Sequence, residues 1–114
     1  MDVLDILKIA AGIGTILTGL FSLILPLRVR GFTGLDVKGG RGITEIRSIL
    51  GGFFVGLGAA VIILNDPAAY ATLGIAYLVV AVVRTISMFV DKSVVQSNII
   101  SVVAEVIFGV ILIL

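Results

Sequence analysis

The chain has 114 residues, of which 60% are hydrophobic and 13% are charged, and its mean hydropathy is +1.31. A domain of this length has too little interior to bury so much apolar surface, which excludes an ordinary water-soluble globular protein. The formal net charge of +1 excludes the basic surface of a nucleic-acid-binding protein. Without Cys or His, the sequence offers no disulfide, haem ligand or usual zinc site, and we expect neither metal nor cofactor.

Four apolar segments are long enough to cross a bilayer, which takes about 20 mostly apolar residues per helix. Each is too long and too uniformly apolar to be a barrel strand, so we expect helices. The first lacks the positive flank and the cleavage site of a signal peptide, so we expect it to be retained. The sequence predicts an all-α fold, an integral membrane four-helix bundle. It forms one transmembrane domain over residues 1–114, with spans at about 7–25, 43–64, 68–90 and 94–114.

The basic residues between the spans predict the orientation. One side of the membrane carries only Lys8, and the other carries Arg28, Arg30, Lys38, Arg41 and Lys92. Because short cytoplasmic loops are enriched in Lys and Arg, the second side is expected to face the cytoplasm. The loop 27–42 is then cytoplasmic, and both termini face outward.

Small residues at helical spacing mark the expected packing faces, because close approach drives helix association in lipid. The first span carries the stripe Gly12, Thr15, Gly19 and Ser22. The second carries the stripe Glu45, Ser48, Gly52, Gly56 and Ala59, which contains a Gly-x-x-x-Gly motif. We expect these stripes to pack within the chain, and a homodimer interface at Gly52 and Gly56 is the alternative.

Four charged residues fall inside the predicted spans, where charges are costly and usually pair. At about 1.5 Å per residue, Glu45 and Arg47 lie roughly 3 and 6 Å from the cytoplasmic end of their span. Arg84 lies roughly 10 Å in and Glu105 roughly 16 Å in, by the same rise. All four are therefore expected in the cytoplasmic half of the membrane or at its edge.

The helical stripes that carry these charges predict one polar cluster. Arg84 is expected to bridge Glu105 and Glu45, because a guanidinium can engage two carboxylates and stays charged. Hydroxyl and amide side chains on the same stripes would add hydrogen bonds. The predicted cluster contains Glu45, Arg47, Ser48, Arg84, Ser87, Asn98, Ser101 and Glu105. It is either an ion pair that fixes helix register or a binding site for a head group, an ion or a proton.

The loop before the second span contains Gly39-Gly40-Arg41-Gly42. This run is not a P-loop, since it lacks the preceding strand and the following Lys-Ser/Thr. It does open a helix N-terminus, where backbone amides favour anions. Lys38 and Arg41 are therefore candidate contacts for an anion or a lipid head group.

The start of the second span carries a recognisable motif. Glu45-Ile46-Arg47 is followed by Gly51-Gly52 and Gly56-x-Gly58, with Arg84 and Glu105 further on. This pattern over roughly Gly39–Leu114 resembles an uncharacterised bacterial family of small four-span membrane proteins, a domain of unknown function. The resemblance implies a multi-pass protein of the bacterial plasma (inner) membrane and supplies no activity.

Two classes of function fit these features better than catalysis. The first is a protein that binds a lipid or a quinone-like ligand, or an accessory protein that docks another membrane subunit. The second is a small homo-oligomeric transporter or channel that uses Glu105 as an ion or proton site. An enzyme is not favoured, because no nucleophile lies with a base and an orienting group, and we assign no catalytic residue.

Overall fold

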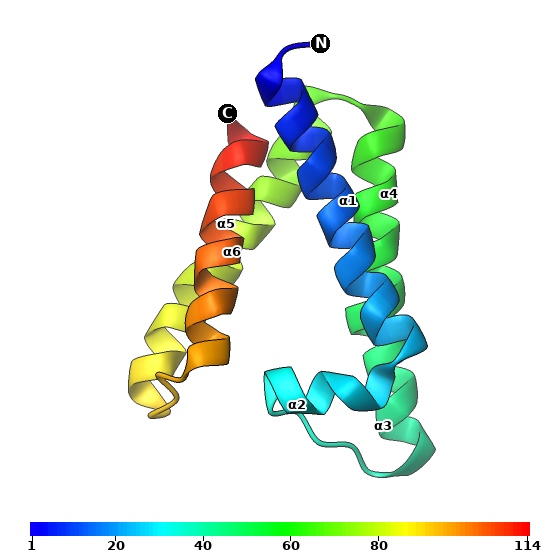
Figure 1. Cartoon of the computed structure of the whole chain (residues 1–114), viewed down its shortest axis with the longest axis vertical. Helices are drawn as coiled ribbons and strands as arrows, with labels where there is room; N and C mark the ends of the chain where they lie inside the picture. Colours follow the sequence, from blue (N-terminus) through cyan, green and yellow to red (C-terminus); the bar gives the residue numbers. More distant parts are fainter. The chain divides into compact units, whose positions relative to one another are not determined.

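The computed structural model describes residues 1–114, which are helical apart from short connections and contain no β-strand (Figure 1). The all-α prediction is therefore confirmed. The elements in chain order are α1 (Val3–Ile24), the 3-10 turn η1 (Pro26–Arg28), α2 (Val29–Thr33), α3 (Gly39–Glu45), the π-helix η2 (Ile46–Phe53), α4 (Phe54–Leu64), α5 (Pro67–Val90) and α6 (Gln96–Ile113).

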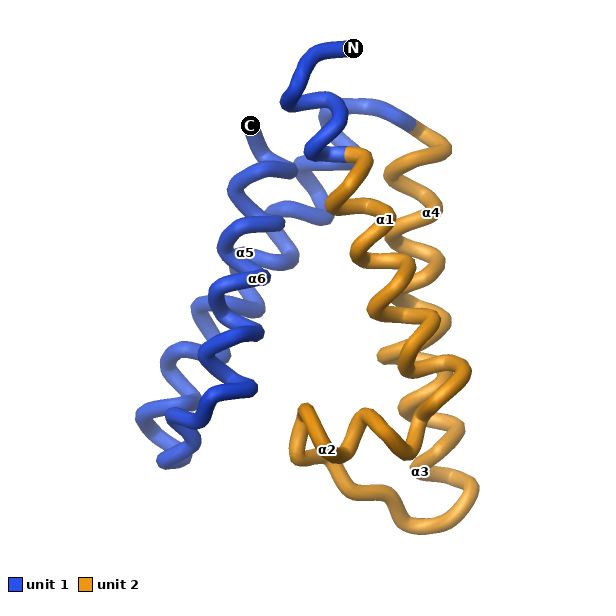
Figure 2. The backbone as a smooth tube through the Cα atoms, in the orientation of Figure 1, with its two compact units in different colours: residues 1–8, 65–114 blue, residues 9–64 orange.

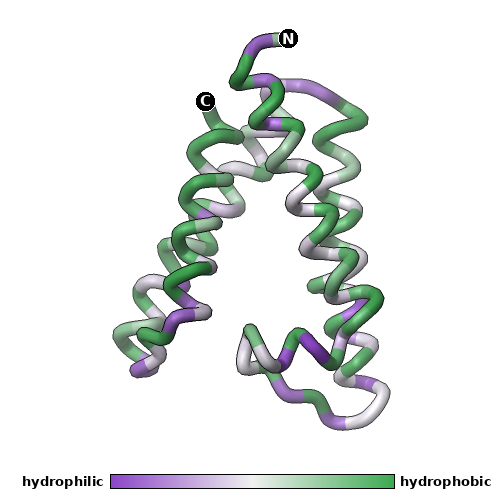
Figure 3. Tube along the Cα trace, in the orientation of Figure 1, coloured by the Kyte–Doolittle hydropathy of each residue, from purple (hydrophilic) through white to green (hydrophobic).

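Four helical segments are long and apolar enough to cross a membrane, as judged by length and composition. They are Val3–Ile24, Gly39–Leu64, Pro67–Val90 and Gln96–Ile113. Hydrophobic residues cover these helices, and polar residues collect at their ends and in the segment between α2 and α3 (Figure 3). The first two helices each begin four residues before the predicted span, because polar and glycine residues extend the helix beyond its apolar stretch.

The chain folds as two compact units (Figure 2). Unit 1 contains residues 1–8 and 65–114, and therefore α5 and α6. Unit 2 contains residues 9–64, and therefore most of α1 with α2, α3, η2 and α4.

The start of α5 follows directly from three consecutive residues. Asn65 has a left-handed backbone (φ 46°), which Asn tolerates better than most residues. Asp66 is the N-cap, and its Oδ1 accepts a hydrogen bond from the backbone N–H of Ala68 at 2.7 Å. Pro67 then occupies the first helical turn, where a missing N–H costs nothing.

The end of α5 is a tight left-handed turn. Lys92 adopts φ 53°, and the N–H of Ser93 donates to the carbonyl of Met88 at 2.8 Å. This is the 6→1 bond of a Schellman motif, and it satisfies a carbonyl that the helix end leaves open. The short turn brings α6 back along α5.

Helices α5 and α6 pack closely through two glycines. A Cβ at Gly74 would lie 2.9 Å from the carbonyl oxygen of Gly109, and a Cβ at Gly109 would lie 2.6 Å from the Leu78 side chain. The rings of Tyr77 and Phe108 meet edge to face at 5.5 Å on the same interface. Only glycine allows the two helices to approach this closely.

In unit 2, the predicted stripe of α1, which contains Gly12 and Gly19, is buried and packs against η2 and α4. The glycines that meet it on the second helix, Gly51 and Gly58, differ from those predicted. A Cβ at Gly19 would lie 2.6 Å from the carbonyl oxygen of Gly51, and one at Gly58 would lie 2.6 Å from that of Gly12. The stripe through Gly52 and Gly56, which was expected to pack within the chain, does not pack against α1, because neither glycine meets another helix of the unit. The π-helix shifts the register, since its i→i+5 bonds take more residues per turn than the α-helical period used for the prediction.

The segment expected as a turn-rich loop over residues 27–42 is partly helical. Pro26 opens η1 and is buried, and Val29 of α2 is only 3% exposed. Gly34 ends α2 with φ 75°, a conformation that favours glycine. The segment is therefore anchored to unit 2 by its own apolar residues rather than being an open loop.

A candidate polar site between α5 and α6

Arg84 and Glu105 lie well inside their helices. Arg84 is six residues before the end of α5 and Glu105 nine residues after the start of α6. At about 1.5 Å per residue, these positions are roughly 9 and 14 Å from the end where the two helices are joined. The regular α-helical period then aims both side chains into the interface, as the sequence predicted.

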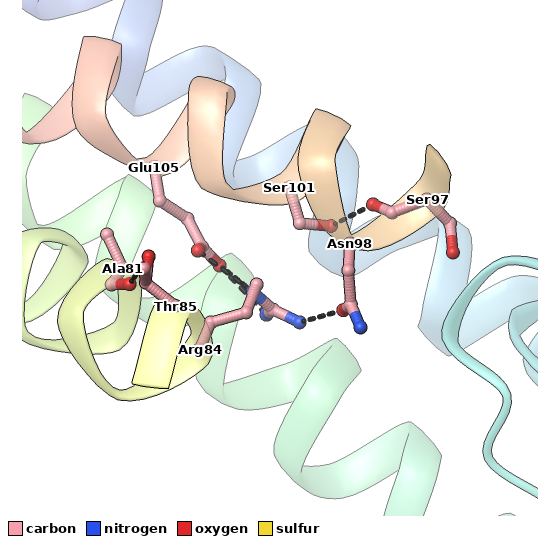
Figure 4. A network of polar contacts seen from close by, with 7 residues as sticks. All are labelled: Ala81, Arg84, Thr85, Ser97, Asn98, Ser101 and Glu105. Carbon is pink, nitrogen blue, oxygen red and sulfur yellow. Dashed lines mark hydrogen bonds and ion pairs between the residues drawn. The ribbon is translucent and has the colours of Figure 1, made fainter. Parts of the chain in front are cut away.

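The two side chains form a bidentate ion pair (Figure 4). Nε of Arg84 donates to Oε1 and Oε2 of Glu105 at 3.0 and 3.2 Å, and Nη2 donates to Oε2 at 2.9 Å. Charge-assisted bonds of this length in a planar fork are among the strongest in proteins. The Arg84–Glu105 pair expected from the sequence is thus present.

Asn98 connects this pair to the turn between the helices. Its Oδ1 accepts a hydrogen bond from Nη1 of Arg84 at 3.1 Å, and its Nδ2 donates to the carbonyl of Ser93 at 2.9 Å. The two bonds use opposite sides of the amide and fix its orientation. Asn98 therefore positions the guanidinium, as well as adding a hydrogen bond to it.

The predicted serines form local bonds instead of joining the cluster. The Oγ of Ser101 donates to the carbonyl of Ser97 at 2.9 Å, and the Oγ of Ser87 donates to the carboxylate of Asp91 (Figure 4 shows the Ser101 bond). Both partners lie one helical turn away on the same helix, where a short hydroxyl side chain reaches most easily.

The cluster is neutral and largely enclosed. The Glu105 side chain is 12% exposed and the Arg84 side chain 34% exposed, and no buried side-chain nitrogen or oxygen lacks a partner. One guanidinium balances one carboxylate, and the Asn98 amide adds no charge. The arrangement can therefore offer hydrogen bonds to a further group without presenting a net charge.

The remaining predicted residues belong to unit 2. Glu45 accepts hydrogen bonds from Arg41 at 3.3 and 3.4 Å, one helical turn earlier on its own helix. Arg47 and Ser48 are exposed on η2, and Lys38 is exposed where it precedes α3. The structure therefore gives Glu45 a local partner in Arg41, which was predicted as an anion contact.

Unit 2 also has an open cavity of about 770 Å³ that was not predicted from the sequence, where Arg28 and Arg30 served only to indicate the membrane orientation. It is lined by Phe21, Leu27, Arg28, Arg30, Gly31, Gly34, Leu35 and Asp36. The signal that could have found the cavity is the alternation of basic and large apolar residues directly after Pro26.

No group of three or more acidic side chains lies close enough to hold a metal ion.

The chain is thus an all-helical protein with four helices able to cross a membrane and an enclosed Arg–Glu pair. Residues 3–114 match the family described as a domain of unknown function, DUF4345, and the chain belongs to that family. This confirms the expected membership of an uncharacterised family. No curated protein and no solved structure matches the chain.

Proposed function

We propose that the chain is a multi-pass protein of the bacterial inner membrane, whose four apolar helices form a bundle with both termini outside. Its composition and the exposed large side chains of its helices support this proposal. On α5, for example, Val82, Val83 and Phe89 are 59%, 61% and 72% exposed. Continuous apolar faces of this kind are stable in hydrocarbon and associate in water.

We further propose that the cluster of Arg84, Glu105 and Asn98 binds the polar head group of a lipid or quinone-like molecule. The observation that carries this proposal is the unused capacity of Arg84. A guanidinium has five N–H groups, of which one on each nitrogen is engaged by Glu105 or Asn98. Two N–H groups remain, on a side chain that is one-third exposed.

The neutrality of the cluster favours a neutral ligand. A charged head group brought to this depth would lose its hydration and gain no opposite charge in return. A carbonyl or ester oxygen, in contrast, can accept the two remaining N–H bonds at little cost. The Tyr77–Phe108 pair lies one to two helical turns away and offers an apolar wall for a ring or an acyl chain.

The alternative, in which Glu105 carries an ion or a proton, has less support. Both carboxylate oxygens of Glu105 already accept hydrogen bonds from Arg84. A mobile cation would have to displace a bidentate guanidinium, which is a costly exchange in a low-dielectric site. A proton or ion flux that depends on Glu105 would nevertheless favour this second function.

The test is native mass spectrometry of the protein released gently from bacterial membranes. We expect wild type to retain a small neutral molecule, and Arg84→Gln to lose it. The double variant Arg84→Gln/Glu105→Gln keeps the cluster neutral, so it should fold. Because it has no guanidinium donors, it should not retain the molecule. Arg47→Gln is the matched control, because it removes an arginine that lies outside the cluster, and it should retain the molecule.

Three results would contradict binding at the cluster. Wild type could carry no small molecule, even after incubation with a short-chain ubiquinone or a diacylglycerol. The double variant could retain the molecule as well as wild type does. A second polypeptide, rather than a small molecule, could leave with the cluster variants, which would make the cluster a docking site for another membrane subunit.

A further inference from the structure

The open, shallow cavity in unit 2 is lined by both basic and large apolar side chains. Phe21, Leu27 and Leu35 provide the apolar lining, and Arg28 and Arg30 provide two guanidinium groups. With Asp36 as the only acid in the lining, one positive charge is left unbalanced. These are the features of a site for an amphiphile with a single negative charge.

The two arginines differ in how they are held. Arg30 donates from Nε to the carbonyl of Leu27 at 3.2 Å and from Nη1 to Oδ1 of Asp36 at 3.4 Å. The Arg28 side chain forms no hydrogen bond or ion pair within the chain and is exposed. Arg30 is therefore preorganised, and Arg28 is the cation that remains available for an external anion.

In the proposed membrane location, the cavity would lie at the depth of the lipid phosphates. It lies directly after α1, the first of the four helices able to cross a membrane, in a segment anchored by Pro26 and Val29. The proposed orientation places this end of α1 at the cytoplasmic leaflet, where anionic lipids concentrate. Gly31 on the cavity wall meets nothing within 4 Å of where its Cβ would stand, which leaves room for a head group.

We propose that this cavity binds one anionic phospholipid, with its phosphate on Arg28 and Arg30 and its acyl chain against Phe21, Leu27 and Leu35. The inference rests on the proposed membrane location and is independent of the ligand at Arg84. The recognised chemistry is a phosphate diester whose head group adds no positive charge, as in phosphatidylglycerol. A zwitterionic lipid carries a cation that Arg28 would repel.

The experiment compares dioleoyl phosphatidylglycerol with dioleoyl phosphatidylcholine, each titrated into delipidated protein in a nonionic detergent and followed by native mass spectrometry. We expect phosphatidylglycerol to bind more tightly. Arg28→Gln should weaken its binding roughly fivefold, the effect of one arginine at a membrane surface, and leave phosphatidylcholine unchanged. Lys92→Gln is the control, since it removes the same charge from an exposed position on the same expected side of the membrane, and Lys92 does not line the cavity.

The inference fails if both lipids bind wild type equally, or if Lys92→Gln weakens phosphatidylglycerol binding as much as Arg28→Gln does. It also fails if inorganic phosphate displaces phosphatidylglycerol as well as an excess of the same lipid does, because the apolar lining would then contribute nothing. Alkaline extraction of membranes separates this failure from that of the membrane proposal. Wild type that leaves the membrane fraction refutes the location, whereas retained protein without lipid preference refutes only the cavity.

Discussion

Arg84 donates from Nε and Nη2 to both carboxylate oxygens of Glu105, 21 residues further along the chain. A planar fork of this kind has one favourable geometry, so it fixes the register of α5 against α6 more strictly than apolar contacts do. The contact between Gly74 and Gly109 sets how closely the same two helices approach. Register and distance in this hairpin therefore depend on different residues.

Removing only one partner of this pair should be costly. Glu105→Leu leaves the Arg84 guanidinium without its carboxylate in an apolar interface. We expect the free energy of unfolding to fall by about 3 kcal/mol, the lower end of the range for broken buried pairs, because Arg84 is one-third exposed. Titration with a denaturing detergent, followed by circular dichroism, measures this change.

The double variant Arg84→Leu/Glu105→Leu tests the cause. It removes both charges and keeps the interface apolar, so it should recover most of the lost stability. If the double variant is as unstable as Glu105→Leu, packing rather than the uncompensated charge explains the loss.

The sequence predicted the Arg84–Glu105 pair and the hydrogen bond with Asn98 correctly because α5 and α6 are regular α-helices, for which a period of 3.6 residues gives the facing side chains. It failed on the second apolar helix, where η2 breaks that period and the packing glycine is Gly51 rather than Gly52. It also assigned Ser87 to the cluster. The Ser87 hydroxyl instead donates to Asp91, one helical turn away. A helical stripe shows which side chains share a face, but it does not show which of them a short hydroxyl will bond to.

Two glycines of α4 should respond oppositely to the same substitution. In Gly58→Ala the added methyl would lie 2.6 Å from the backbone oxygen of Gly12 and 2.9 Å from the backbone nitrogen of Ile16. Because backbone cannot move aside cheaply, we expect a loss of about 1–3 kcal/mol in the free energy of unfolding.

Gly56→Ala is the matched comparison, since nothing lies within 4 Å of its Cβ position. It should be neutral or stabilise the helix by up to about 1 kcal/mol, the difference in helix propensity between Ala and Gly. Detergent titration of both variants gives the comparison. A marked loss in Gly56→Ala that grows with dilution would instead indicate that this face contacts a second copy of the chain.

The Asp36 carboxyl should titrate below its ordinary pKa of 3.8. The backbone N–H of Val37 donates to the carboxylate and lowers the pKa most, and the hydrogen bond from Arg30 lowers it further. The contribution of this carboxylate to the folded segment is therefore present above the ordinary pKa and is lost as the pH falls through the lowered one. Carbon-13 NMR of the Asp36 carboxyl measures the titration directly.

Arg30→Gln separates the two causes of this shift. It should raise the Asp36 pKa only part of the way toward its ordinary value, because the Val37 amide still donates. A full return to the ordinary pKa in Arg30→Gln would show that the backbone bond contributes little.

The orientation can be tested because the chain contains no cysteine. The excess of Lys and Arg on one side predicts that Lys38 faces the cytoplasm and that Asp2 faces outward. In intact cells, a membrane-impermeant maleimide should therefore label Asp2→Cys and leave Lys38→Cys unlabelled until the membrane is opened. Both positions are exposed in the structure, so a lack of labelling reports the membrane rather than burial. If only Lys38→Cys is labelled in intact cells, the orientation is the reverse of the predicted one. The Arg28 cavity would then lie at the outer leaflet.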